Sequence, residues 1–256
     1  MDRRIGAQYY TLRDYIQNTE DFDTTCKKVA DMGYQVIQIS ASPLPAKEMR
    51  KITDKYGLKT VVTHRGFEDF VKNVDEIIEY NRVLDSEFCG IGCMPFEYTE
   101  NKDTLDDFIQ KTNRAAEKIK KAGMTLAYHN HAFEFAKIHG KTIMDWILEE
   151  TDPENVQFTV DTYWVQFGGV NPADFIRKVG KRAALVHFKD FAMDQKEINK
   201  QKMAEVGQGN LDWDGIIKAC DEVGTKWALV EQDICERNPF DSMKMSYEFL
   251  KLKGFH

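Results

Sequence analysis

Residues 105–130 read LDDFIQKTNRAAEKIKKAGMTLAYHN, and the hydrophobic period of this stretch changes once along its length. Its first part, Leu105–Ala122, carries one stripe of apolar or small residues at Leu105, Phe108, Ile109, Thr112, Ala115, Ala116 and Ile119. A stripe with this spacing is typical of a helix that packs one face on a core. Gly123 follows as a helix-ending signal, and the run Thr125–Asn130 has the composition of a buried strand. The stretch therefore predicts one helix followed by one strand.

The same alternation extends over the chain in both directions. Helical stripes also lie at Asp21–Met32 and Asp214–Val223, and Gly33, Gly57 and Gly224 mark helix ends that precede strands. Strands that alternate with helices in this way form a parallel sheet. Eight short apolar runs predict the strands: Ile5–Tyr10, Val36–Ser40, Lys59–His64, Phe88–Met94, Thr125–Asn130, Val156–Asp161, Ala184–Phe188 and Trp227–Glu231.

Two parallel architectures compete for this pattern, an open doubly wound sheet and a closed barrel. No Gly-x-Gly-x-x-Gly follows the first run, so the dinucleotide fingerprint of the open fold is absent. Eight units in 256 residues match a closed barrel, which takes about 250 residues. No linker or low-complexity tract divides the chain. We therefore predict an α/β protein with one (β/α)8 TIM barrel domain over residues 1–256.

Composition narrows the classes of partner. Lys and Arg number 35 and Asp and Glu 42, so the formal net charge is −7 and no basic footprint for nucleic acid is expected. No apolar run approaches the ~20 residues of a membrane span, and the first residues lack the apolar stretch of a secretion signal. The five cysteines are an odd number without paired metal-ligand motifs, which indicates free thiols. We expect a cytoplasmic protein without nucleic-acid or membrane partners.

Four polar residues follow buried runs at the predicted mouth of the barrel. Glu134, Asp161, His187 and Glu231 stand 27, 26 and 44 residues apart, and the carboxyl ends of barrel strands meet at one face. Three carboxylates brought this close repel one another, and a divalent cation removes that difficulty. Carboxylate oxygens with one imidazole suit Mn²⁺, Mg²⁺, Co²⁺ or Zn²⁺. The sequence therefore predicts one divalent metal ion, with Mn²⁺ favoured.

Purely structural interpretations stay open at this point. A single strand-end Asp or Glu is often a helix N-cap or a salt-bridge partner. His129 and His131 share one strand face, with Asn130 on the other, so His129 either faces the mouth or packs against a helix. Four further residues near strand ends are candidates for contact with a substrate: His64, His131, Trp164 and Lys189.

Several segments at these strand ends carry a family resemblance. They are Tyr128–Phe135 (YHNHAFEF), Val160–Trp164 (VDTYW), Val186–Asp190 (VHFKD), Glu205–Trp213 (EVGQGNLDW), Val230–Asp233 (VEQD) and, near the start, Gln8–Arg13. With them the sequence resembles the xylose isomerase-like TIM barrels, commonly called sugar phosphate isomerases/epimerases, and is similar to the branch that contains inosose dehydratase. The resemblance spans nearly the whole chain and is specific for the superfamily rather than for a substrate.

The resemblance implies a divalent metal held by Glu134, Asp161, His187 and Glu231. In the ketose epimerases of this superfamily, the glutamates that follow strands five and eight also transfer protons. The matching positions here are Glu134 and Glu231, which are therefore the expected catalytic residues. Those epimerases carry a His three residues after the strand-six Asp, where this chain has Trp164.

These observations together predict a divalent-metal-dependent sugar or cyclitol isomerase or epimerase that transfers an α-proton through a metal-stabilised enediolate. Expulsion of a β-hydroxyl after the same first step would give a dehydratase of an inosose-type ketone, and a sugar-binding barrel without turnover is the other alternative. A phosphodiesterase of the barrel-endonuclease type is disfavoured by the negative charge and by only six histidines. The expected partner is a small sugar or polyol, and homo-oligomerisation is left open.

Overall fold

The eight predicted strand runs form a closed, fully parallel barrel in the computed structural model, which describes residues 1–256. The barrel strands are β1 (Gly6–Gln8), β2 (Val36–Ile39), β3 (Lys59–Arg65), β4 (Phe88–Ile91), β5 (Thr125–His129), β8 (Val156–Asp161), β9 (Leu185–Phe188) and β12 (Trp227–Val230). Each strand pairs with the next one in this order, and β12 pairs with β1 to close the barrel. The prediction of a (β/α)8 TIM barrel is therefore confirmed.

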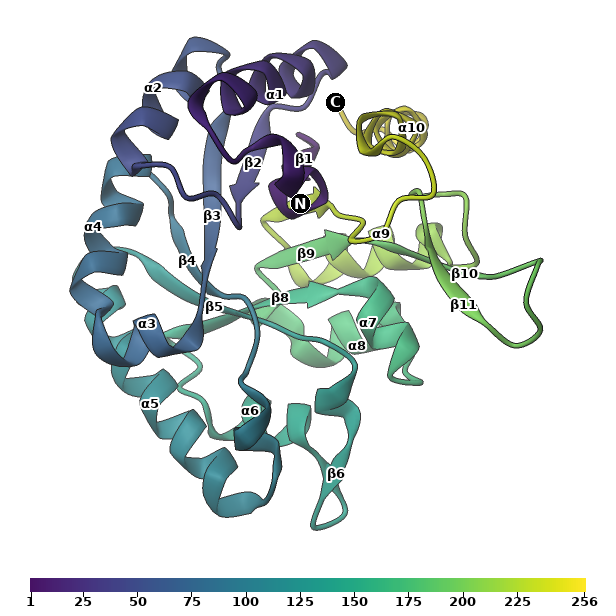
Figure 1. The fold of residues 1–256 in the computed structure, drawn as a ribbon. Coiled ribbons are helices and arrows are strands. Elements are labelled where there is room, and N and C mark those ends of the chain that lie inside the picture. Colours follow the sequence, from purple (N-terminus) through teal and green to yellow (C-terminus); the bar gives the residue numbers. More distant parts are fainter.

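Helices surround the barrel on its outside (Figure 1). They are α1 (Thr19–Met32), α2 (Ala46–Lys55), α3 (Phe67–Lys72), α4 (Val74–Leu84), α5 (Lys102–Lys121), α6 (Ile143–Glu150), α7 (Thr162–Phe167), α8 (Pro172–Val179), α9 (Trp213–Val223) and α10 (Pro239–Leu252). The predicted stripe over 105–122 lies in α5, which begins at a capping box formed by Asn101 and Thr104. The stripe residues of α5 are all buried, as a helix packed on a barrel requires.

The apolar core has two parts. The larger one lies between the strands and the helices and includes Phe108 of α5, Tyr128 of β5 and Phe158 of β8. The smaller one is built from residues at or near the starts of strands, such as Val36, Phe88, Leu185 and Trp227. Because apolar side chains gather at the amino ends of the strands, the polar side chains of the barrel interior are left at the carboxyl ends.

Two hairpins extend the barrel at its mouth, β6 (Lys137–Ile138) with β7 (Lys141–Thr142), and β10 (Asp190–Met193) with β11 (Gln201–Ala204). The carboxylate of Asp190 anchors the second hairpin, because it accepts hydrogen bonds from the backbone N–H groups of Gly207 (2.8 Å) and Gly209 (3.0 Å) and from Trp213 Nε1 (2.7 Å). The glycine turn at 207–209 therefore binds a carboxylate of this chain itself.

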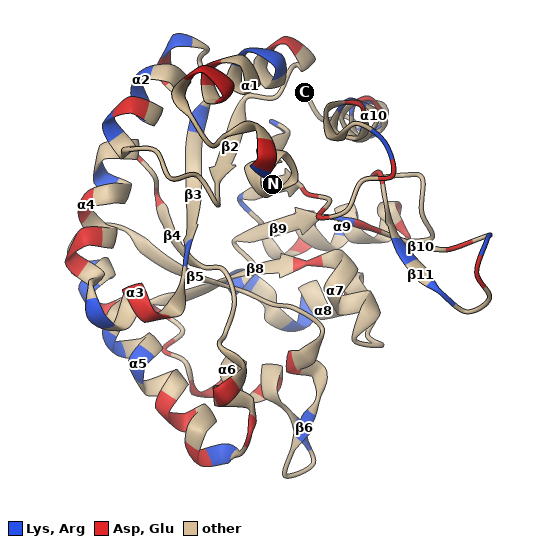
Figure 2. Ribbon diagram, viewed as in Figure 1, with Lys and Arg blue, Asp and Glu red and all other residues tan.

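Charged side chains of both signs alternate along outer helices such as α2, α4 and α5 (Figure 2). Many pair along one helix, as Lys121 does with Glu117 (2.6 Å) and Arg82 with Glu79 (2.6 Å). No helix combines the length with the apolar character that crossing a bilayer needs.

Candidate metal centre and active-site cavity

Four buried side chains meet at the carboxyl end of the barrel. They are His129, Asp161, His187 and Glu231, and one ligand atom from each lies within 4.8 Å of all the others. They come from the ends of β5, β8, β9 and β12, which are neighbouring strands of the closed barrel. Three of the four predicted metal ligands are thus brought together, and His129 is the fourth member. Two imidazoles and two carboxylates are a donor set that divalent transition metals accept.

Each histidine of the cluster has one ring nitrogen bound to a fixed oxygen. His129 Nδ1 lies 2.9 Å from the carbonyl oxygen of Gly92, and His187 Nε2 lies 2.8 Å from Gln38 Oε1. Both oxygens accept, so these nitrogens donate and the lone pair of a neutral ring falls on the other nitrogen. The free nitrogen of each ring faces carboxylates: His129 Nε2 lies 3.3 Å from Asp161 Oδ2, and His187 Nδ1 lies 2.8 Å from Glu231 Oε2.

The contact between His187 and Glu231 fits a site for a cation. Although the two atoms are close, His187 Nδ1 is buried and makes no hydrogen bond of acceptable geometry. A nitrogen lone pair that faces a carboxylate needs a proton or a metal ion between them. Burial works to lower the pKa of His187, but the neighbouring carboxylates of Glu231 and Asp161 together outweigh it and raise the pKa to about 9. Binding of a metal ion would displace that proton.

Asp161 is placed to cap a helix and to bind a metal ion at the same time. Its Oδ1 accepts a hydrogen bond from the backbone N–H of Trp164 (2.9 Å) and caps the first turn of α7, while its Oδ2 faces the two histidines. Its own N–H donates to Asn130 Oδ1 (3.0 Å). The N-cap and metal-ligand interpretations of this residue are therefore compatible, since each uses a different oxygen.

A buried ammonium group borders the cluster. Lys189 is 1 % exposed, and its Nζ lies 2.7 Å from Asp233 Oδ2 and 3.4 Å from both Asp161 Oδ2 and Glu231 Oε2. Burial works to raise the pKa of Glu231, but the charges of Lys189 and His187 outweigh it and lower that pKa. The same ammonium helps to hold the pKa of Asp161 well below its usual value against the effect of burial. Both carboxylates therefore stay ionised.

Glu134, which the sequence predicted to be a metal ligand, lies outside this cluster. Its carboxylate accepts hydrogen bonds from Tyr128 Oη (2.7 Å) and from the backbone N–H of His131 (2.9 Å), and the side chain is fully buried away from the cavity described below. Tyr128 packs outward against Phe108 of α5, so the next residue, His129, faces the barrel interior. The short turn Phe133–Phe135 then folds Glu134 back onto Tyr128. This alternation was the signal that could have identified His129.

Glu134→Gln is expected to make stability less sensitive to pH. Burial raises the pKa of Glu134 from 4.5 to about 7, so the folded state keeps a proton that the unfolded state releases. A raised folded-state pKa stabilises the fold below pH 4.5, and this stabilisation is lost as the pH rises through 7. The unfolding free energy of the variant relative to the wild type should thus increase by up to about 3 kcal/mol between pH 5 and 8.

Urea unfolding in metal-free buffer at several pH values measures this difference. The matched control is Glu149→Gln, because Glu149 has an exposed carboxylate that pairs with Lys141 at the surface. A difference between Glu134→Gln and wild type that stays constant over this pH range would contradict the prediction.

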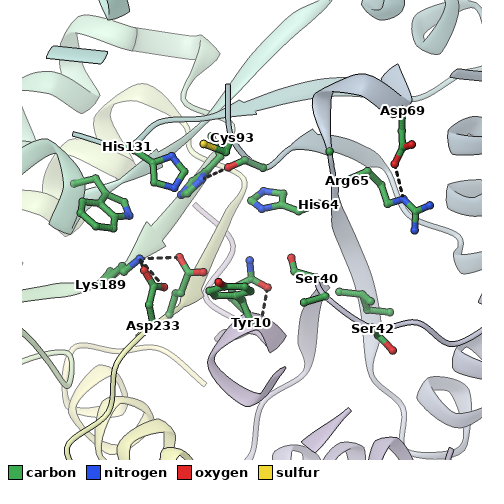
Figure 3. Close-up of a pocket in the computed structure, with 18 of the residues that line it drawn as sticks. Tyr10, Ser40, Ser42, His64, Arg65, Asp69, Cys93, His131, Lys189 and Asp233 are labelled. Carbon is green, nitrogen blue, oxygen red and sulfur yellow. Dashed lines mark hydrogen bonds and ion pairs between the residues drawn. The ribbon is translucent and has the colours of Figure 1, made fainter. Parts of the chain in front are cut away.

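A cavity of about 530 Å³ opens above the cluster, and His129 and Glu231 reach its wall. All four residues predicted to contact a substrate also line it: His64, His131, Trp164 and Lys189. Figure 3 shows His131 and Lys189 on one side of the cavity, with His64 nearer its middle. Their role in binding a substrate stays a prediction.

Three of the polar atoms in this wall are buried without a partner: His64 Nε2, His131 Nδ1 and Trp164 Nε1. Unpaired buried polar atoms are costly, and a hydroxylated ligand would satisfy them. The backbone also makes room for His64, because a Cβ at Gly90 would come within 2.4 Å of its ring. Burial and the neighbouring His129 lower the pKa of His64 well below its usual value, so its imidazole is neutral.

Comparisons with known proteins agree with this fold. A family described as xylose isomerase-like TIM barrel matches residues 26–252. Inosose dehydratase from Geobacillus kaustophilus is 26 % identical over 160 residues, which cover 57 % of this chain and 51 % of the relative. Inosose dehydratase from Geobacillus thermodenitrificans is 27 % identical over 165 residues, which cover 59 % of this chain and 55 % of the relative. The chain thus spans about half the length of the curated relatives it matches.

Solved structures show the same fold over nearly the whole chain. A sugar phosphate isomerase/epimerase from Parabacteroides distasonis superposes with a TM-score of 0.79 at 23 % identity and covers 97 % of this chain and 94 % of its own. An L-ribulose 3-epimerase superposes with a TM-score of 0.74 at 16 % identity and covers 98 % of this chain and 94 % of its own.

Proposed function

The chain belongs to the xylose isomerase-like TIM barrel family, and from this premise we propose that it is a divalent-metal-dependent enzyme that transfers a proton at the carbon next to a carbonyl in a small sugar or polyol. One observation carries the proposal. The imidazoles of His129 and His187 are each held by an oxygen on one nitrogen and face buried carboxylates with the other. This arrangement is typical of metal-ligating histidines.

The residues of the cluster would hold the metal ion, and neighbouring groups would orient them. His129, Asp161, His187 and Glu231 would hold the ion, with Mn²⁺ the first candidate, and its chemistry when bound is to polarise a carbonyl oxygen and to offset developing negative charge. Asp161 also caps α7 and so ties its position to the fold. Gln38 and the carbonyl of Gly92 would orient the two imidazoles.

Glu231 is the group to which we assign the α-proton. It is the only carboxylate of the cluster whose residue also lines the cavity, so its Oε atoms are within reach of a bound molecule. Lys189 Nζ, 3.4 Å away, would hold Glu231 in the ionised form, which is the form that can accept a proton. Trp164 would exclude water from this side of the cavity, since its ring lies 5.0 Å from the same ammonium.

The predicted proton transfer by Glu134 would require a rearrangement. Its carboxylate would have to leave Tyr128 and the backbone of His131 and turn toward the cavity. We therefore propose that Glu134 acts as a positioning residue, which holds the backbone at His131 in place.

A dehydratase of an inosose-type ketone is the second candidate. The sequence similarity to inosose dehydratases, at 26–27 % identity over part of the chain, supports it. Removal of the α-proton would be the same first step, and the departing β-hydroxyl would then need a proton donor. Lys189 Nζ is the cationic donor nearest to Glu231 in the cavity wall.

The test is solvent deuterium uptake by a panel of ketoses and inososes in deuterated water. We expect deuterium at the carbon next to the carbonyl of at least one compound, loss of uptake after exhaustive chelation, and recovery with Mn²⁺ or Co²⁺. Loss of a β-hydroxyl in the same samples would identify the dehydratase. Uptake that is unchanged by chelation, or absent for every compound with Mn²⁺ present, would contradict the proposal.

A further inference from the structure

The cavity extends well beyond the cluster of His129, Asp161, His187 and Glu231. Its far end is formed by residues at the carboxyl ends of β2 and β3 and by the helices that follow: Ser40, Ser42, Arg65, Gly66, Asp69 and Tyr80. In Figure 3, Arg65, Asp69 and Ser42 lie across the cavity from His131 and Lys189, and His64 lies between the two groups. We refer to the six residues at this end as the distal wall.

The geometry points to a second-ring subsite at the distal wall: it fits a neutral, polyhydroxylated ring, so the substrate would be a two-ring glycoside whose carbonyl-bearing ring lies at the cluster. This inference rests on the proposed function for the reacting ring. A volume of about 530 Å³ leaves room beyond one six-carbon ring and falls within the ~300–1,000 Å³ of sites that enclose larger ligands.

Arg65 and Asp69 supply donors and acceptors side by side. Arg65 Nε lies 3.6 Å from Asp69 Oδ2, and both side chains are 41 % exposed, so the ion pair is loose. The guanidinium has five N–H donors and the carboxylate only accepts, which leaves several hydrogen-bonding positions free on both. Adjacent hydroxyl groups on a sugar ring both donate and accept, so they match such a pair.

The ion pair of Arg65 and Asp69 disfavours the binding of an anionic group. The carboxylate of Asp69 balances the charge of Arg65 and would repel a phosphate or carboxylate placed against the guanidinium. The neighbouring donors are neutral hydroxyls, and the Oγ of the buried Ser40 makes only one long contact, 3.5 Å from Gln38 Nε2. The distal wall is therefore polar without a net positive charge.

The aromatic ring of Tyr80 keeps Arg65 in place. The guanidinium lies over this ring, 5.0 Å from its centroid, while the following residue, Gly66, adds no side chain to the cavity. A guanidinium held against an aromatic ring loses less conformational freedom when it binds a ligand. The guanidinium of Arg65 is thus held against Tyr80 before a ligand binds.

Calorimetric titration with glucose, glucose 6-phosphate and the disaccharides cellobiose, trehalose and sucrose tests the inference. At least one disaccharide should bind at least about tenfold more tightly than glucose, as expected for two or more added hydrogen bonds. Arg65→Ala should remove this advantage and leave glucose binding within about twofold. Arg82→Ala, which removes an exposed arginine of α4 that pairs with Glu79, is the matched control and should keep the advantage.

The Asp69→Asn variant distinguishes a subsite for a neutral group from a subsite for an anionic group. It should improve binding of glucose 6-phosphate relative to glucose, because it removes the repelling charge. The inference is overturned if no disaccharide binds more tightly than glucose, if Arg65→Ala keeps the advantage, or if glucose 6-phosphate already binds best to the wild type.

The titrations are repeated after chelation, which makes the two proposals distinguishable. The disaccharide advantage belongs to the distal wall and should persist without metal. A persistent advantage in a protein that never exchanges a proton would contradict the proposed function alone, and exchange without the advantage would contradict the second-ring subsite alone.

Discussion

Glu231→Gln is expected to reduce α-proton exchange with solvent by at least about a hundredfold at saturating Mn²⁺. The substitution keeps the shape of the side chain but removes the charge that accepts the proton. Glu231 is also a member of the buried cluster, so the variant should bind Mn²⁺ more weakly. Exchange must therefore be measured at a Mn²⁺ concentration at which the metal content of the variant equals that of the wild type.

A matched control is Glu236→Gln. Glu236 lies five residues further along the chain, is exposed and pairs with Lys202 at 3.0 Å. The Glu236→Gln variant should exchange the α-proton of the substrate at the wild-type rate. Wild-type exchange in Glu231→Gln with full metal content would reject the proton-transfer role of Glu231, but it would not contradict metal binding by the four-residue cluster.

Lys189→Met is expected to destabilise the metal-free protein by about 3–5 kcal/mol. The ammonium lies among Asp161, Glu231 and Asp233, and its removal leaves these carboxylates buried without their cation. A divalent ion would neutralise two of the same carboxylates, so Mn²⁺ should restore much of the lost stability. Since the ammonium also opposes a second cation nearby, Mn²⁺ should raise the Tm of the variant more than that of the wild type.

Thermal unfolding with chelator and with Mn²⁺ measures both effects. Lys121→Met is the control, because Lys121 is exposed on α5 and pairs only with Glu117, and its stability should stay within about 0.5 kcal/mol of the wild type. A metal-free Lys189→Met protein as stable as the wild type, or equal Mn²⁺ shifts in both proteins, would contradict the electrostatic account.

The barrel could be predicted from the sequence because its signal is repeated. Strands such as Val156–Asp161 are buried on both faces and follow helices with one apolar stripe, and each repeat supports the others. Strand ends were less exact: the run predicted over Phe88–Met94 is a strand only to Ile91. The 44-residue interval between His187 and Glu231 contains the β10–β11 hairpin, which was not predicted because it depends on the contacts of Asp190 with distant backbone groups.

The three cluster residues that the sequence predicted, Asp161, His187 and Glu231, each lie within one residue of the carboxyl end of a strand. His129 also ends its strand, but the sequence left open whether it faces the mouth or a helix. Asp161 and Glu231 come at the last position of a strand or just after it, so strand geometry alone places them at the mouth. Glu134 comes five residues after β5, and its direction is decided by a short turn and by the hydroxyl of Tyr128. The sequence contains no local signal for that contact, which pairs a strand residue with a loop residue through their side chains.

The central claim is that His129, Asp161, His187 and Glu231 bind a divalent metal ion. Titration with Mn²⁺ followed by electron paramagnetic resonance tests it most directly, in the wild type, His129→Ala, Asp161→Asn and Glu134→Gln. We expect one tightly bound Mn²⁺ per chain in the wild type, affinity lower by at least about a hundredfold in His129→Ala and Asp161→Asn, and near-wild-type affinity in Glu134→Gln. No binding by the wild type, or binding that depends on Glu134 and not on His129, would contradict the account.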